Sequence, residues 1–226
     1  MRAKLTSIIL ILFIALLVCQ GCAFFAVKED KYAQELADDG MEAYHEGDYK
    51  RAIESFEKIK DWYPFSKYAM LAELKIADSH YKLKEYDDAV TAYEEFEHLH
   101  PLNDAIPYVI FQAGLCYFER VDTPDRDQTT ARKALDTFNR LIKQFPKDTY
   151  ALKAGEYTNI CYKSLAESEF GIGLYYYKSK YYKAALKRFK TVITNYPDVG
   201  VHQKAIQYIA LCETTLSKQD KKSALH

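Results

Sequence analysis

A pattern of four residue positions recurs four times at one spacing in this 226-residue chain. From its first position, usually tyrosine, the pattern has alanine at +3, an aromatic residue at +7 and proline at +15. The alanine and the second aromatic residue are four apart, so they share a helical face, and the proline ends that helix. The pattern therefore predicts four helices with a common stop. The four sets are Tyr49, Ala52, Phe56 and Pro64; Tyr86, Ala89, Tyr93 and Pro101; Ala131, Ala134, Phe138 and Pro146; and Tyr182, Ala185, Phe189 and Pro197.

A second apolar-periodic segment precedes each of these helices, as in a solenoid of antiparallel helix hairpins. The spacing resembles the tetratricopeptide repeat, because Gly40 and Gly173 lie nine residues before the tyrosines of their repeats and Gly47 lies in the first inter-helix turn. We therefore expect an all-α fold, an α-solenoid of about five tetratricopeptide-like helix hairpins. The alternative is an ordinary helical bundle with a coincidental spacing.

The positions that depart from the repeat predict its irregular parts. The third repeat is longer, and its extra residues lie in a polar loop over Val121–Thr130. A degenerate fourth repeat over Tyr150–Leu165 should run into the first helix of a fifth, Ala166–Ser179. Small or polar residues thirteen positions after each repeat proline should mark close approaches between neighbouring helices. These are Ala77, Gly114, Asn159 and Ala210.

The amino-terminal segment has the composition of an export signal. Arg2 and Lys4 precede an apolar run over Ile8–Cys19, which is shorter than the roughly 20 residues that a membrane-spanning helix needs. Gly21-Cys22 at its end resembles the bacterial lipobox, although Cys19 stands where that box usually has leucine. The resemblance implies acylation of Cys22, and Ala23 after it, where enteric inner-membrane lipoproteins have aspartate, implies the outer membrane.

The expected domain organisation follows from these segments. Residues 1–21 are the lipoprotein signal peptide, and 22–31 form a lipidated tether. One elongated repeat domain spans 32–217, because the remaining chain has no room for a second large domain. Residues 218–226 form a frayed carboxy terminus.

No group of residues indicates catalysis, a metal or another cofactor. Cys116, Cys161 and Cys212 each lie fifteen residues after a repeat proline, so we expect them at one equivalent core position and not in a disulfide. His98 and His100 are two apart at a helix end, a spacing that does not suit one metal site. Since phosphate-binding loops and nucleophile motifs are also absent from the sequence, we expect the chain not to be an enzyme.

Charge is distributed unevenly along the chain. Residues 23–125 hold 23 acidic and 11 basic residues, a net of −12, whereas residues 126–226 hold 9 acidic and 18 basic residues, a net of +9. This separation favours a protein partner or an anionic lipid surface, although ordinary solvated helix faces are the alternative. Nucleic acid is not an expected partner, because export removes the chain from it.

Several stretches go beyond generic repeat spacing and resemble the BamD family, the lipoproteins of the outer-membrane β-barrel assembly machinery. They are Tyr63–Ala69, Pro107–Val109 leading to Gly114-Leu115, Asp125–Asp127 before Ala131-Arg132, and Leu165-Ala166 with Glu169 and Tyr175-Tyr176. The resemblance implies five repeats anchored by lipid at the periplasmic face of the outer membrane. It also implies docking of the carboxy-terminal repeats on a POTRA domain of the subunit BamA, accessory lipoproteins as neighbours, and amino-terminal repeats that receive unfolded barrel precursors.

Two sets of candidate binding residues agree with this resemblance. Tyr63, Phe65 and Tyr68 could hold an extended precursor segment in a groove between hairpins, or could pack between repeats. Six basic residues and no acidic one occupy Lys178–Lys190, so a row of cations should lie on one helix face. For BamA docking we expect Lys183, Lys187 and Arg188, with Arg188 as the preferred carboxylate anchor; pairing within the chain is the alternative.

Two other classes of protein remain compatible with parts of the sequence. A generic periplasmic repeat scaffold that coordinates cell-envelope enzymes would share the repeats, but not the inserted loop or the Tyr63–Ala69 junction. A lipid-anchored enzyme would need a catalytic cluster. Purification from membranes would distinguish the classes by what accompanies the protein: BamA, a cell-wall enzyme, or neither.

Overall fold

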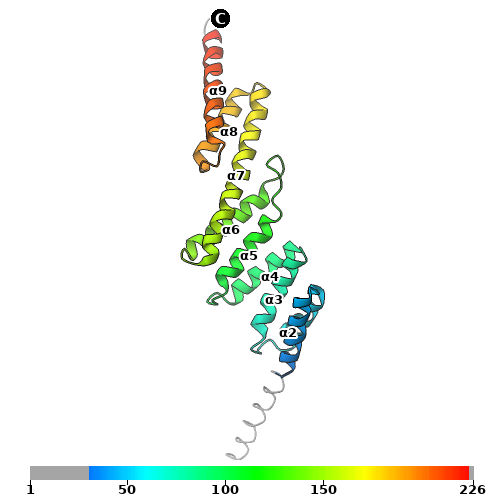
Figure 1. Ribbon diagram of the computed structural model, residues 1–226. Coiled ribbons are helices and arrows are strands. Elements are labelled where there is room, and N and C mark those ends of the chain that lie inside the picture. Colours follow the sequence, from blue (N-terminus) through cyan, green and yellow to red (C-terminus); the bar gives the residue numbers. More distant parts are fainter. Residues whose placement is uncertain (1–30, 224–226) are drawn as a thin grey trace, which may run out of the picture. The chain divides into compact units, whose positions relative to one another are not determined.

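The computed structural model describes residues 31–223 as helices joined by short loops (Figure 1). A helical segment over 31–46 is followed by α2 to α9. No strand occurs in the described part of the chain, so the all-α prediction is confirmed. The signal peptide, Cys22, nearly all of the tether and residues 224–226 lie outside the described residues. The helices are α2 Tyr49–Trp62, α3 Ala69–Lys82, α4 Tyr86–Leu99, α5 Ile106–Phe118, α6 Thr129–Gln144, α7 Thr149–Lys178, α8 Tyr182–Asn195 and α9 His202–Ser223.

The chain divides into two compact units, which we call the N-terminal unit (residues 1–92) and the C-terminal unit (residues 93–226), with the boundary inside α4. In the N-terminal unit the 31–46 segment, α2 and α3 enclose a core around Phe56 and Ile59. In the C-terminal unit successive helices from α5 to α9 pack on one another. Its last hairpin has a core of its own around Phe189 and Val192.

The aromatic residue at +7 packs on a glycine of the preceding helix in three hairpins. A Cβ atom built on Gly40 would lie 2.8 Å from the Phe56 ring, and one on Gly173 would lie 2.6 Å from Phe189. Gly114 faces Phe138 in the same way, at 2.5 Å. Since real Cβ atoms do not approach so closely, these positions require glycine. The glycine lets each ring reach the partner helix, which explains why glycine and ring are 16 residues apart in the first and last of these hairpins; the inserted loop lengthens the interval in the other.

Each tight turn between paired helices also repeats one geometry. Gly47, Lys84 and Lys180 all precede the pattern's first tyrosine by two residues, and all have a positive φ, of 82°, 61° and 65°. Tyrosine rings five residues apart meet edge to face across these turns, with centroids 5.4 Å apart for Tyr44 and Tyr49 and 5.6 Å for Tyr177 and Tyr182. The first aromatic position of the pattern therefore closes the turn.

The repeat prolines follow the helix ends that they were expected to set. Helices α2, α4, α6 and α8 end at Trp62, Leu99, Gln144 and Asn195, each two residues before its proline. The last helix, α9, instead exceeds its predicted end near Ser217 and continues to Ser223. Residues 218–223 are thus helical, contrary to the expectation of fraying there.

The two irregular regions lie where the sequence placed them. The predicted fourth repeat and the start of the fifth form a single 30-residue helix, α7. The inserted loop leads into α6, and Gln128, which is 5% exposed, holds it in place. The Gln128 amide nitrogen donates to the carbonyl oxygens of Thr123 and Arg126, while its oxygen accepts from the Ser164 hydroxyl of α7 at 2.8 Å. A buried polar side chain with these partners fixes the loop against α7.

Candidate functional site

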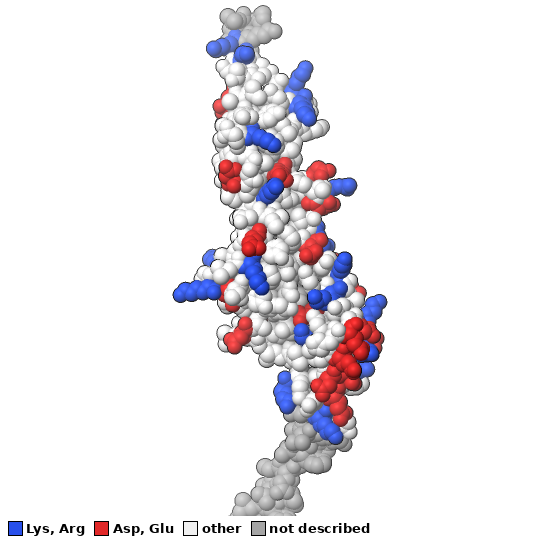
Figure 2. All heavy atoms as spheres, in the orientation of Figure 1, with Lys and Arg blue, Asp and Glu red and all other residues white. Residues whose placement is uncertain are grey.

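The start of α8 carries the expected row of cations. Lys180, Lys183 and Lys187 are all exposed. Lys183 and Lys187 lie one turn apart on α8, whereas Lys180, with its positive φ, lies in the turn before the helix. On the face drawn in Figure 2, acidic side chains gather over the N-terminal unit, whereas lysines stand out where α7 ends and α8 begins. The structure therefore leaves Lys183 and Lys187 accessible to a partner.

Arg188, the preferred docking anchor, is engaged within the chain. Its Nη1 atom donates to both carboxylate oxygens of Glu169 on α7, at 3.2 and 2.9 Å. The Glu169 side chain is 11% exposed and that of Arg188 is 39% exposed. Lys190 is also paired, with Glu213 of α9 at 2.9 Å. Two of the six cations thus pair inside the C-terminal unit. For these two residues the structure matches the alternative from the sequence, pairing within the chain.

The Glu169–Arg188 ion pair lies beside a tyrosine that responds to both charges. Burial raises the pKa of the Tyr196 hydroxyl, and the negative charge of Glu169 raises it further. The guanidinium groups of Arg132 and Arg188 act in the opposite direction. The Tyr196 hydroxyl, in the loop between α8 and α9, thus responds to the charges of the ion pair that joins α7 to α8.

The three proposed precursor-binding residues lie in the loop between α2 and α3, but in different environments. Phe65 is 100% exposed. Tyr63 is half-buried, and Tyr68 packs against the core around Phe56, as the packing alternative had it. The structure also shows Trp62 at 63% exposure directly before them, which the sequence reasoning missed. The sequence did hold a signal for the exposure of Trp62. It lies two residues before the repeat proline, and polar residues occupy the same position before Pro146 and Pro197.

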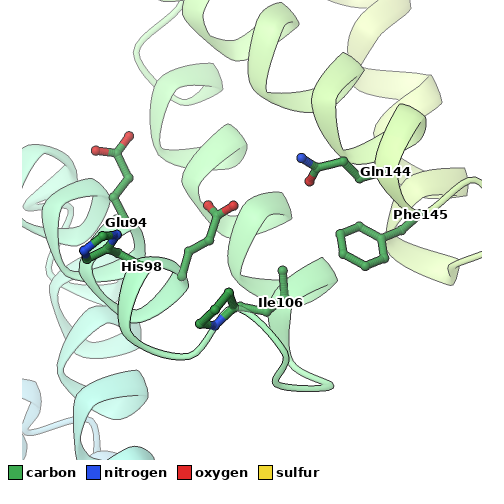
Figure 3. Close-up of a pocket in the computed structure, with 7 residues that line it drawn as sticks. Glu94, His98, Ile106, Gln144 and Phe145 are labelled. Atoms are coloured by element: carbon green, nitrogen blue, oxygen red, sulfur yellow. The ribbon is translucent and has the colours of Figure 1, made fainter.

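Figure 3 shows a surface pocket of about 610 Å³ between the end of α4, the start of α5 and the end of α6. Its walls combine Glu94, Glu97 and His98 with apolar residues. Both carboxylate oxygens of Glu97 accept hydrogen bonds from Arg140 of α6, so one of its two acids is paired. The lining residues include no hydroxyl or thiol nucleophile, and we assign the pocket no catalytic role. They are Glu94, Glu97, His98, Pro101, Ile106, Gln144 and Phe145.

One group of metal-ligand side chains does meet in the described residues, at a place that spacing alone did not suggest. Ligand atoms of His80, Glu85 and Asp88 lie within 4.8 Å of one another across the α3–α4 turn. His80 Nδ1 and a Glu85 carboxylate oxygen are 2.8 Å apart, and the Glu85 amide donates to the His80 carbonyl. These hydrogen bonds connect the two sides of the α3–α4 turn and explain why the three side chains lie together. We therefore assign no metal to this group.

The three cysteines occupy the equivalent core positions that were predicted. Cys116, Cys161 and Cys212 are fully buried and unpaired. Burial raises the pKa of the Cys116 thiol to about 12 and that of Cys161 to about 11. These thiols therefore remain protonated at neutral pH and serve as small core residues.

Together these features define a class: an all-α protein built of tetratricopeptide-like helix hairpins. The YfiO family, described as an outer membrane lipoprotein, matches residues 29–225. The chain belongs to this family. In the part that the structure describes, no helix is both long and apolar enough to cross a membrane.

Curated relatives carry one common name, outer membrane protein assembly factor BamD. The one from Rickettsia prowazekii is 32% identical over 200 residues, which cover 85% of this chain and 78% of the relative. The one from Caulobacter vibrioides is 28% identical over 178 residues and 76% of this chain. The matched part spans 58% of that relative's own length.

Solved structures of tetratricopeptide repeat proteins are more distant. A protein from Parabacteroides merdae aligns at 14% identity and a TM-score of 0.44, over 86% of this chain and 77% of that one. A thermophilic protein from Thermus thermophilus aligns at 15% identity and a TM-score of 0.42, over 79% and 99%. The assignment of the family therefore depends on the sequence matches, and that of the fold on the hairpins described above.

Proposed function

We propose that this chain is an outer membrane protein assembly factor of the BamD type, a lipid-anchored scaffold that helps unfolded β-barrel precursors fold and insert. The observation that carries the proposal is the match of residues 29–225 to the family, with relatives named as such assembly factors. Exposed cations on α8 and exposed aromatic residues after α2 give the scaffold two binding surfaces. Co-purification of BamA and the accessory lipoproteins from membranes tests it, and recovery of cell-wall enzymes instead would favour a generic scaffold.

The cationic surface of α8 is the proposed docking site for a POTRA domain of BamA. Lys183 and Lys187 are exposed. Arg188 donates to Glu169 through Nη1, so its other guanidinium nitrogens could donate to a carboxylate of the partner. Charge on such a surface speeds association and is screened by salt. Lys183→Glu with Lys187→Glu should therefore weaken BamA binding by about tenfold or more.

The test needs a control for net charge and one for folding. Lys204→Glu with Lys218→Glu makes the same charge change on exposed positions of α9 and should leave affinity unchanged. Arg188→Glu alone would place two carboxylates together at Glu169, so the exchanged pair Arg188→Glu with Glu169→Arg tests Arg188 instead. Equal affinity of the Lys183/Lys187 variant and the wild type, with an intact helical spectrum, would reject the site.

We propose that the loop after α2 receives precursor segments through Tyr63, Phe65 and Tyr68. Phe65 offers a fully exposed ring, and Tyr63 remains half-exposed beside it. Affinity should be modest, because an unfolded segment loses conformational entropy when it binds. Photo-crosslinkers at 63, 65 and 68 should capture barrel precursors, whereas the exposed position 152 of α7 serves as a control. Capture at 152 but not in the loop would overturn this assignment.

Acylated Cys22 is the proposed anchor to the outer membrane, on its periplasmic face. The short apolar run before Gly21-Cys22 supports it. Cys22→Ala should release the protein from membranes or leave it unprocessed. Mass spectrometry that finds an unmodified Cys22 in the mature, membrane-bound form would contradict the anchor.

A further inference from the structure

Two large apolar side chains project from the loop that joins α2 to α3. Trp62 is 63% exposed and Phe65 is 100% exposed, with the repeat proline between them. Single exposed apolar residues are common, but a tryptophan and a phenylalanine on one short loop are a larger apolar surface than solvent favours. Equivalent positions in the loop after α4 hold Leu99 at 51% and Leu102 at 95% exposure, so the feature recurs in the next repeat.

The loop lies at the end of its hairpin where the chain enters from the amino terminus. Gly40 faces Phe56, and the Asp48 amide donates to the Ala43 carbonyl, so the 31–46 segment and α2 run antiparallel. The end of α2 therefore returns to the start of the first helix, as Figure 1 shows for the blue part of the chain. Tyr32 at that start is 45% exposed.

The proposed lipid anchor limits how far this end can lie from the membrane. Tyr32 lies ten positions after Cys22, and a fully extended chain covers at most about 3.5 Å per position, or about 35 Å in all. The end of the hairpin that carries Trp62 and Phe65 is thus held within reach of the bilayer surface. Tryptophan and tyrosine favour the membrane interface, and phenylalanine favours its apolar side.

We propose that Trp62 and Phe65, together with Tyr32 at the same end of the hairpin, insert into the interfacial layer of the membrane and orient the first hairpin on it. This rests on the proposed anchor at Cys22. A fully exposed apolar ring on a surface loop suits entry into a lipid layer, because no neighbouring side chain covers it. Phe65 also belongs to the proposed precursor site, so an apolar precursor segment is the competing occupant.

Trp62 supplies the probe, because it is the chain's only tryptophan. The lipidated full chain is reconstituted in vesicles of phosphatidylethanolamine and phosphatidylcholine, with and without brominated lipid. We expect blue-shifted Trp62 emission, strong quenching by the brominated lipid, and acrylamide quenching reduced about threefold relative to unlipidated Cys22→Ser in solution. Because the contact is apolar, these values should change little with salt. Emission and acrylamide quenching equal to those of the soluble protein would overturn the proposal.

Matched variants separate insertion from other effects. Phe65→Ser should weaken the quenching by brominated lipid, whereas Leu152→Ser, which removes a 69% exposed apolar side chain from α7, should not. If the Trp62 signal shifts with a soluble aromatic-rich peptide from a barrel strand but not with vesicles, the loop is a precursor site only. If Cys22 is not acylated, a chain that starts at residue 22 can be held on nickel-chelating lipid by an amino-terminal histidine tag, and Trp62 emission is measured in the same way. This control distinguishes failure of the lipid anchor from failure of Trp62 and Phe65 to insert.

Discussion

The N-terminal and C-terminal units use one packing device and carry opposite charge. Gly40 and Phe56 interlock in the first unit as Gly173 and Phe189 do in the second. Yet the N-terminal unit holds 16 acidic and 12 basic residues, whereas the C-terminal unit holds 16 acidic and 19 basic residues, with the basic excess after residue 125. The comparison shows that the repeat specifies only the inner face of each hairpin. The outer faces are free to differ, and the proposed binding surfaces lie on them.

The largest effect should come from removing the interlocking ring in either unit. Phe56→Ala and Phe189→Ala each delete a fully buried aromatic side chain, at a cost of about 3–5 kcal/mol in the free energy of unfolding. Hydrogen exchange followed by mass spectrometry should localise the loss to the unit that holds the variant. Unequal costs, or loss spread evenly over residues 31–223, would break the equivalence of the two units.

A smaller effect should follow from opening the Glu169–Arg188 ion pair, whose equivalent positions in the first hairpin hold Leu36 and Ser55. Glu169→Gln leaves Arg188 without its anion, and since Arg188 is partly exposed we expect a cost of about 2 kcal/mol by urea unfolding. The variant should also lower the pKa of Tyr196, because the charge of Glu169 raises it. Glu213→Gln, which opens the exposed pair with Lys190, should cost less than about 1 kcal/mol.

Substitutions at two glycines of α7 separate the effect of packing on stability from the effect of helix propensity. Gly173→Ala forces a Cβ into the Phe189 ring and should destabilise by about 1–3 kcal/mol. At Gly171 the added Cβ meets nothing within 4 Å, so Gly171→Ala should stabilise by about 0.5–1 kcal/mol. Thermal unfolding of both variants measures the difference in sign. Two changes of the same sign would mean that the interlock does not decide the residue at 173.

The smallest effect concerns two of the three buried thiols, Cys116 and Cys161, which lie in the C-terminal unit. The folded pKa values of Cys116 and Cys161 are raised to about 12 and about 11, above the ordinary value of 9.0. Between pH 9 and 11 the unfolded chain therefore loses protons that the folded chain keeps, and stability falls as pH rises. Urea midpoints at pH 8 and pH 10 should differ less for Cys116→Ala than for the wild type. Thiol reagents should react slowly at pH 8.

The sequence was sufficient to predict those parts of the fold in which the repeated residues determine the packing. It located the helix stops at the prolines, the inserted loop, the long helix α7 and the three core cysteines. It was wrong for Asn159 and Ala210, which are exposed where a close approach was expected. Gly114 meets Phe138 because α6 follows in the same hairpin, whereas α7 continues straight past Asn159 and no helix is described beyond α9.

The candidate site was predictable in part, for a similar reason. Helical spacing correctly placed Lys183 and Lys187 on an exposed face. Spacing within one helix could not reveal that Glu169, nineteen residues earlier, would pair with Arg188, because that contact depends on how α7 and α8 pack. Likewise, the partial burial of Tyr68 and the exposure of Phe65 in one loop depend on the core of the first hairpin.

The length of α7 has a consequence for how this molecule comes apart. In a solenoid with one short helix pair per repeat, hairpins can open one by one, each limited by contacts with its nearest neighbours. Here a single helix of 30 residues, about 45 Å long, packs on α6 at one part and on α8 at another. Melting either repeat would break the continuous backbone ladder that the other uses. The two repeats should therefore act as one cooperative block under tension or denaturant, and a load applied at α8 would be transmitted to α6.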